Sequence, residues 1–159
     1  MVRAGLGLIL RAQSGVEVVG ECDDGAEVAE AVERLAPDVV CMDVRMPGID
    51  GIEATRRLRA ADGPPVCMLT TFGDEDVLWA AIDAGAAGFE LKSATAENLV
   101  EAVRTVAAGG TWIDGSLLGP IVDSYRRIAR PGGGRGPGPL HEVLTDREVD
   151  VLRLMARGA

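Results

Sequence analysis

Three short apolar runs, each followed by a polar side chain, constrain the fold of this chain more than any other feature. They are VVCM (39–42), VCML (66–69) and GFEL (88–91), and the residues that follow them are Asp43, Thr70 and Lys92. Continuous apolar runs are typical of strands that are covered on both faces. Helical patterns of about 10–15 residues separate the runs, so the sequence predicts an α/β fold with a parallel sheet.

The remaining pattern predicts further elements on both sides of these runs. Val2, Leu6, Ile9 and Leu10 fall on one helical face, and VEVV (16–19) is a short β-rich run that we expect to be a strand. Asp24 is expected to cap a helix that Pro37 ends. Three more helices are expected through 52–58, 77–82 and 99–106.

Composition excludes several classes of protein. Aromatic residues make up 3% of the chain, so the core must be aliphatic. No apolar run is long enough to span a bilayer, and the N-terminus does not resemble a signal peptide, so we expect a cytoplasmic protein with no membrane partner. Cys41 and Cys67 lie in apolar runs and are expected to be buried, reduced thiols. The single histidine, His141, argues against a zinc site or a serine–histidine triad.

The charge and the Gly/Pro content divide the chain. Residues 1–125 hold 9 basic and 21 acidic residues, whereas residues 126–159 hold 7 and 4. The stretch PGGGRGPGP (131–139) is expected to be a flexible linker, and a capping box then begins at Thr145. We therefore predict a domain over 1–110, a helix and linker over 111–141, and the start of a helical domain over 142–159, with any nucleic-acid contact in the basic tail.

The three strand-end side chains suit phosphoryl chemistry. Ligands of open α/β sheets bind at the carboxyl ends of the strands. An aspartate there can accept a phosphoryl group, whose negative charge then needs a cation and hydrogen-bond donors. Lys92 is the only lysine among 16 basic residues. Taken singly, the aspartate, threonine and lysine are more often a cap, a turn residue and a surface charge, so the prediction depends on their order and spacing.

VVCMDVRMPGIDGIEATRRL resembles the phosphoacceptor segment of response-regulator receiver domains, and LTTF and GAAGFELK are similar to later segments of that family. The resemblance covers residues 1 to about 110. It implies Asp43 as the phosphoacceptor, Thr70 as the switch hydroxyl, Lys92 as the phosphate-binding lysine and Phe89 as the aromatic that reorients on activation. It also implies a Mg²⁺ cofactor bound by Asp43 and the backbone carbonyl of Arg45.

LTDREVDVLRLMARG (144–158) resembles the start of a LuxR-type helix-turn-helix, which makes the chain similar to NarL/FixJ-type regulators. The resemblance thus implies a flavodoxin-like receiver followed by an incomplete all-α helix-turn-helix fragment. By comparison with the family, the chain is expected to be truncated at both ends. The first strand of the receiver and the acidic pair that follows it are absent, and the recognition helix is not reached.

These departures change what the resemblance implies. With Asp43 as the one remaining carboxylate, Mg²⁺ is expected to bind weakly. Asp23 and Asp24 could be read as a substitute acidic pair, but a loop with Asp24 as a helix cap is the preferred interpretation.

Two functions stay open. The first is a response regulator of a two-component phosphorelay that controls transcription. A sensor histidine kinase would phosphorylate its aspartate, and its DNA-binding output is incomplete in this chain. The second is a receiver remnant that acts without phosphorylation as a protein-interaction or homodimerisation module. An independent enzyme on a flavodoxin-like sheet is disfavoured, because the sequence has no Gly-rich nucleotide loop and no catalytic histidine or cysteine pairing.

Overall fold

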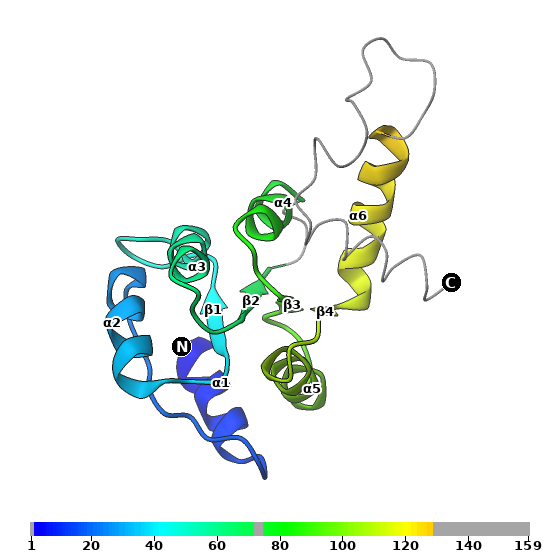
Figure 1. Ribbon diagram of the computed structural model, residues 1–159. Helices are drawn as coiled ribbons and strands as arrows, with labels where there is room; N and C mark the ends of the chain where they lie inside the picture. Colours follow the sequence, from blue (N-terminus) through cyan, green and yellow to red (C-terminus); the bar gives the residue numbers. More distant parts are fainter. Residues whose placement is uncertain (1, 72–74, 129–159) are drawn as a thin grey trace. The chain divides into compact units, whose positions relative to one another are not determined.

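A computed structural model describes residues 2–71 and 75–128 and contains a parallel four-stranded sheet (Figure 1). The strands are β1 (Val40–Asp43), β2 (Val66–Thr70), β3 (Gly88–Leu91) and β4 (Trp112–Ile113), and they lie side by side in that order. The three strands predicted from the apolar runs are therefore present. The predicted α/β class with a parallel, flavodoxin-like receiver sheet is confirmed.

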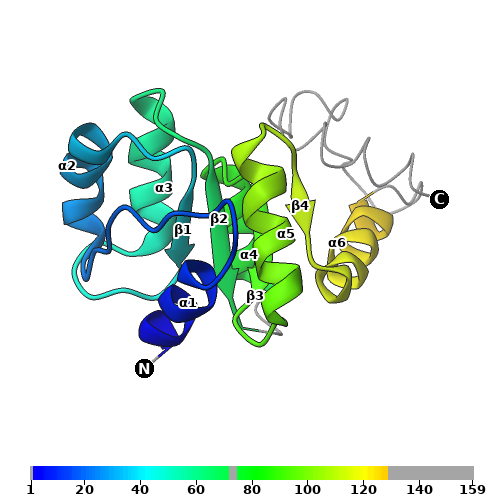
Figure 2. The same cartoon turned by 90° about the horizontal axis from the view of Figure 1, so that it is seen from below.

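Helices cover both faces of this sheet. They are α1 (Val2–Arg11), α2 (Gly25–Leu35), α3 (Gly51–Ala60), α4 (Glu75–Asp83) and α5 (Ala96–Ala107). Helices α3 and α4 lie on one side of the sheet, and α1 and α5 lie on the other (Figures 1 and 2). A separate unit begins at Asp114 and contains α6 (Gly115–Ile128).

The core is aliphatic, as predicted. Strand β2 is buried along its whole length. On the α5 side, Leu69 packs with Leu99, Val100 and Val103, and Leu10 of α1 completes this cluster. Because the strands are buried, their register relative to one another is well defined, and this register determines where the strand ends lie.

The expectation of a strand at VEVV (16–19) was wrong. These residues form no strand, although Val16 and Val18 pack against the core cluster. A strand is defined by its hydrogen-bonded neighbour, and in the described part of the chain no strand pairs with this run. These valines therefore bury apolar surface against the core cluster without joining the sheet.

Strand β4 was not predicted, and a buried carboxylate explains how so short a strand is held. Glu90, in the middle of β3, is 0% exposed. Its Oε1 accepts a hydrogen bond from the Leu91 N–H at 2.8 Å, and its Oε2 accepts one from Nε1 of Trp112 at 2.9 Å. Glu90 thus connects β3 to the first residue of β4.

The predicted linker at 131–139 and the predicted helix-turn-helix fragment at 142–159 lie outside the described residues. The division of the chain at 110 and 141 stays a prediction. Within residues 2–71 and 75–128, every helix is too short or too polar to span a bilayer.

All three cysteines are free thiols. Cys67 is fully buried, as predicted, whereas Cys41 is half-buried because β1 lies at an edge of the sheet. Burial raises the pKa of Cys41 to about 11. Burial also raises the pKa of Cys67, and the neighbouring Cys41 and Glu90 raise it further. Since the thiolate is the reactive form, both thiols should be inert at neutral pH.

Replacing Glu90 tests the role of the buried carboxylate. Glu90→Gln leaves one carbonyl oxygen for two N–H donors, so we expect it to lower the free energy of unfolding by about 1–3 kcal/mol in urea denaturation. Glu101→Gln, at an exposed position of α5, is the matched control and should change stability by less than about 0.5 kcal/mol. Equal stabilities of the two variants would contradict this role.

Alkylation tests the state of the thiols. In the native protein at neutral pH, iodoacetamide should modify Cys22 well before Cys41 and Cys67, and peptide mass spectrometry can assign each site. In denaturing urea all three should react at similar rates. Rapid native alkylation of Cys67 would show that the α5 side of the sheet is not closed.

Candidate functional site

Three polar residues meet at the carboxyl edge of the sheet. Asp43 is the last residue of β1, Thr70 is the last residue of β2, and Lys92 comes directly after β3. The register pairs Asp43 with Leu69 and Thr70 with Leu91, so the carboxyl ends of the three strands lie within about one residue of one another. Parallel strands with this register deliver their terminal side chains to one place.

Asp43 and Lys92 form an ion pair across this edge. The distance from Nζ of Lys92 to Oδ2 of Asp43 is 2.7 Å. The Lys92 and Asp43 side chains are 20% and 34% exposed, so the pair is sheltered but open to a reactant. The backbone N–H of Lys92 donates to the carbonyl oxygen of Thr70 at 2.8 Å, which fixes the start of the lysine side chain.

The second carboxylate oxygen of Asp43 is held by the loop that follows it. Oδ1 accepts a hydrogen bond from the backbone N–H of Arg45 at 2.9 Å. The N–H of Gly51 donates to the carbonyl of Val44 at 2.9 Å, which closes the loop between β1 and α3. One oxygen of Asp43 is therefore fixed by backbone, and the other by a flexible side chain.

Thr70 and Phe89 are both buried beside the carboxyl edge of the sheet. The Thr70 side chain is buried, and its hydroxyl donates to the carbonyl of Thr71 at 3.3 Å. Phe89 is 1% exposed in β3, with Met68 and Ile113 as its register partners. The roles of Thr70 as a switch hydroxyl and of Phe89 as a reorienting aromatic stay predictions.

The donor set at Asp43 does not by itself make a Mg²⁺ site. Receiver domains generally bind Mg²⁺ at the phosphorylation site, but residues 2–71 and 75–128 contain no group of three or more acidic, histidine or cysteine side chains that could hold a metal. Asp24, considered as part of a substitute pair, is the N-cap of α2, as preferred in the sequence interpretation. The assignment of Asp43 and the backbone carbonyl of Arg45 as Mg²⁺ ligands stays a prediction.

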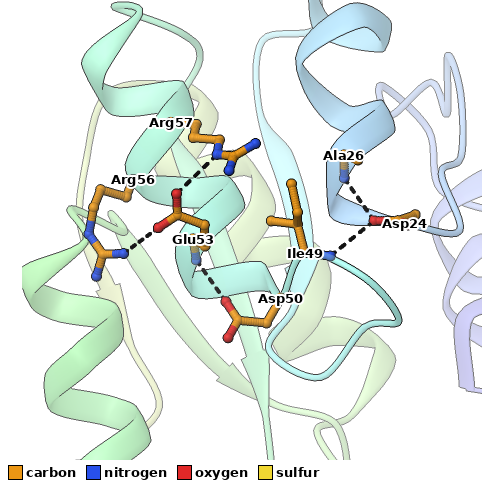
Figure 3. Close-up of polar contacts among 7 residues, drawn as sticks. All are labelled: Asp24, Ala26, Ile49, Asp50, Glu53, Arg56 and Arg57. Atoms are coloured by element: carbon orange, nitrogen blue, oxygen red, sulfur yellow. Dashed lines mark hydrogen bonds and ion pairs between the residues drawn. The ribbon is translucent and has the colours of Figure 1, made fainter.

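The close-up in Figure 3 shows one contact of the neighbouring loop and one cluster on α3 that the sequence analysis did not identify. Asp24 contacts the loop as well as its own helix, through the N–H of Ile49 at 3.2 Å. At the start of α3, Glu53 pairs with Arg57 at 3.0 Å and with Arg56 at 2.6 Å. The hydrogen bonds from Arg57 and Arg56 hold the pKa of Glu53 below its ordinary value. The i, i+3 and i, i+4 spacings could have indicated these pairs.

The matched family model identifies the family of this chain. The model of the response regulator receiver domain matches residues 1–104. The chain belongs to the response regulator receiver family. The carboxyl-edge site and the segment that resembles the phosphoacceptor segment of the family both lie within the matched residues.

Known response regulators are similar over nearly the whole chain. The transcriptional regulatory protein LiaR of Bacillus subtilis is 38% identical over 159 residues, which cover 99% of this chain and 72% of LiaR. The response regulator protein VraR of Staphylococcus aureus is 34% identical over 160 residues, with 99% and 72% coverage.

Solved structures of response regulators are similar to this chain in fold. A LuxR-family two-component response regulator from Aurantimonas sp. superimposes with a TM-score of 0.73 at 31% identity, over 79% of this chain and 90% of that one. The receiver domain of the response regulator NarL from Mycobacterium tuberculosis gives a TM-score of 0.65 at 37% identity, over 68% and 88%. These relatives agree with a receiver of the NarL/FixJ type.

A double-mutant cycle tests the ion pair of this receiver. Asp43→Asn and Lys92→Met should show a coupling energy of about 0.2–1 kcal/mol in urea denaturation, since the pair is partly exposed, and the coupling should fall with added salt. The control cycle combines Lys92→Met with Asp50→Asn and should show no coupling. Coupling of equal size in both cycles would mean that Asp43 and Lys92 do not interact specifically.

Proposed function

We propose that this chain is a receiver of a two-component response regulator that accepts a phosphoryl group on Asp43 and thereby controls transcription. The observation that carries the proposal is the ion pair between Asp43 and Lys92 at the carboxyl edge of a receiver sheet. A carboxylate provides the nucleophile there, and an ammonium provides a compact charge suited to phosphate.

The two oxygens of Asp43 have different roles in this proposal. Oδ1 is held by the backbone of Arg45, whereas Oδ2 is held only by the flexible side chain of Lys92. Oδ2 therefore attacks phosphorus, the bond from phosphorus to the donor breaks, and an aspartyl phosphate forms. The ammonium of Lys92 then moves from the carboxylate to the phosphoryl oxygens, which carry the added negative charge.

Thr70 and Phe89 are proposed to respond to that charge. The Thr70 hydroxyl donates to a carbonyl one residue away, an interaction that a phosphoryl oxygen can replace. Withdrawal of the Thr70 side chain toward the phosphate would leave space beside β3, into which Phe89 reorients. Phosphorylation would thus shift an equilibrium between two conformations of Thr70 and Phe89.

Mg²⁺ enters the proposal with a limited role. Asp43 and the backbone carbonyl of Arg45 are the groups of this chain that would contribute to its coordination, and the cation would neutralise charge on the phosphoryl group. Because one carboxylate is a poor set of ligands, we expect weak binding. The steps assigned to Lys92 and to the loop do not depend on the cation.

The family suggests the partners. A sensor histidine kinase would donate the phosphoryl group, and DNA would be the target of an output domain after the receiver. LiaR is described as a transcriptional regulatory protein and VraR as a response regulator protein. The net positive charge of residues 126–159 supports a DNA contact within that stretch of the sequence. A homodimer is the proposed form in which a receiver of this type acts.

Intact-mass spectrometry after incubation with acetyl phosphate and Mg²⁺ tests the proposal. The wild type should gain the mass of one phosphoryl group, and Asp43→Asn should gain none. Asp50→Asn, which removes a carboxylate seven positions later and keeps a helix-capping side chain, should still be phosphorylated.

A wild type that gains no mass would reject phosphotransfer in this chain and favour the interaction module. Light scattering coupled to size-exclusion chromatography then distinguishes the remaining readings. A defined dimer without phosphorylation is expected for an interaction module, and a monomer argues against it.

A further inference from the structure

Asp24 joins helix α2 to the loop that carries the phosphoacceptor's backbone partner (Figure 3). Its Oδ1 accepts a hydrogen bond from the N–H of Ala26 at 2.9 Å, which caps α2. The same oxygen accepts a second hydrogen bond from the N–H of Ile49 at 3.2 Å, 25 residues away. A helix cap needs only the first of these bonds.

Two glycines allow this close approach. Gly48 has a φ of +70°, and a Cβ at this position would collide with the carboxylate of Asp24. A Cβ at Gly25 would collide with the carbonyl oxygen of Ile49. The loop and the first turn of α2 thus touch through backbone and one carboxylate, and a larger residue at either glycine would push them apart.

The contact lies on a short path to the reactive carboxylate. The loop is closed at its base by the hydrogen bond from Gly51 to Val44 and is held near its far side by Asp24. Between these two points lies Arg45, whose N–H binds Oδ1 of Asp43. The Arg45 N–H belongs to the same peptide unit as the Val44 carbonyl, so the hydrogen bond at the base of the loop orients it directly, and Asp24 acts on it through the residues between Arg45 and Ile49.

We propose that Asp24 is a positioning residue for phosphoryl transfer to Asp43. It acts through the loop: its carboxylate fixes Ile49, the fixed loop presents the Arg45 N–H, and that N–H orients the carboxylate of Asp43 for attack. The inference rests on the proposed function, since it assigns a role in the same reaction. Preorganised geometry of this kind lowers the entropic cost of reaching the transition state.

Three variants separate positioning from capping. Asp24→Asn keeps the side-chain oxygen and should preserve both bonds. Asp24→Ser keeps a good N-cap, but its side chain is one atom shorter, so it should cap α2 without holding Ile49. Thr95→Ala removes the cap of α5, where the threonine oxygen accepts from the Asn98 N–H, and serves as the control for general loss of a cap.

Amide hydrogen exchange by NMR tests the loop contact in the unphosphorylated full chain. Asp24→Ser should speed exchange at Ile49 by about tenfold, which corresponds to the loss of one hydrogen bond, and should speed exchange at Arg45 by a smaller factor. Asp24→Asn and Thr95→Ala should leave both amides close to wild type. Unchanged exchange at Ile49 in Asp24→Ser would overturn the inference.

Phosphorylation rates with acetyl phosphate, followed by intact mass, test the consequence. Asp24→Ser should slow phosphorylation of Asp43 by about tenfold, while Asp24→Asn and Thr95→Ala keep the wild-type rate. Faster exchange with an unchanged rate would make Asp24 structural only and would overturn the positioning role. A wild type that is not phosphorylated rejects the proposed function, and the exchange result still decides whether Asp24 holds the loop.

Discussion

The carboxylate of Asp43 joins two parts of the chain that lie 49 residues apart, and the site depends on how its two oxygens are shared. One oxygen binds a backbone N–H two residues later, which ties it to the loop before α3. The other binds the ammonium of Lys92 at the end of β3. A carboxylate held in this way is oriented by rigid structure on one side and can exchange partners on the other.

The parallel sheet makes this arrangement possible. Parallel strands with matched register bring their carboxyl ends to one edge, so residues far apart in sequence meet without a dedicated binding loop. The core beneath them is closed by aliphatic side chains of β2 and α5. The register of the three strands brings Asp43 and Lys92 within reach of each other. The core packs directly beside this edge, since Leu69 of the cluster is the register partner of Asp43.

Much of this could be predicted from the sequence, because the decisive signals are local. Mostly apolar runs predicted β1, β2 and β3, and the residues after them predicted which side chains share the edge. The prediction of a strand at 16–19 was wrong, because a strand requires a hydrogen-bonded neighbour that the local sequence does not reveal. Strand β4 was missed because two residues carry no periodicity, and because the contact between Glu90 and Trp112 that supports its pairing with β3 is tertiary. A glutamate within a strand covered on both faces was an unused sign that a buried polar partner exists. Asp24 was recognised as a cap, but its bond to Ile49 is a tertiary contact without a sequence signature.

The central claim is that Asp43 is the residue that takes up the phosphoryl group, and chemical trapping tests it most directly. Borohydride reduces an aspartyl phosphate to homoserine, so treatment after incubation with acetyl phosphate marks the residue that was modified. Tandem mass spectrometry of the peptide containing residues 40–45 should then find homoserine at position 43. Homoserine at another aspartate, or at none, would contradict the account.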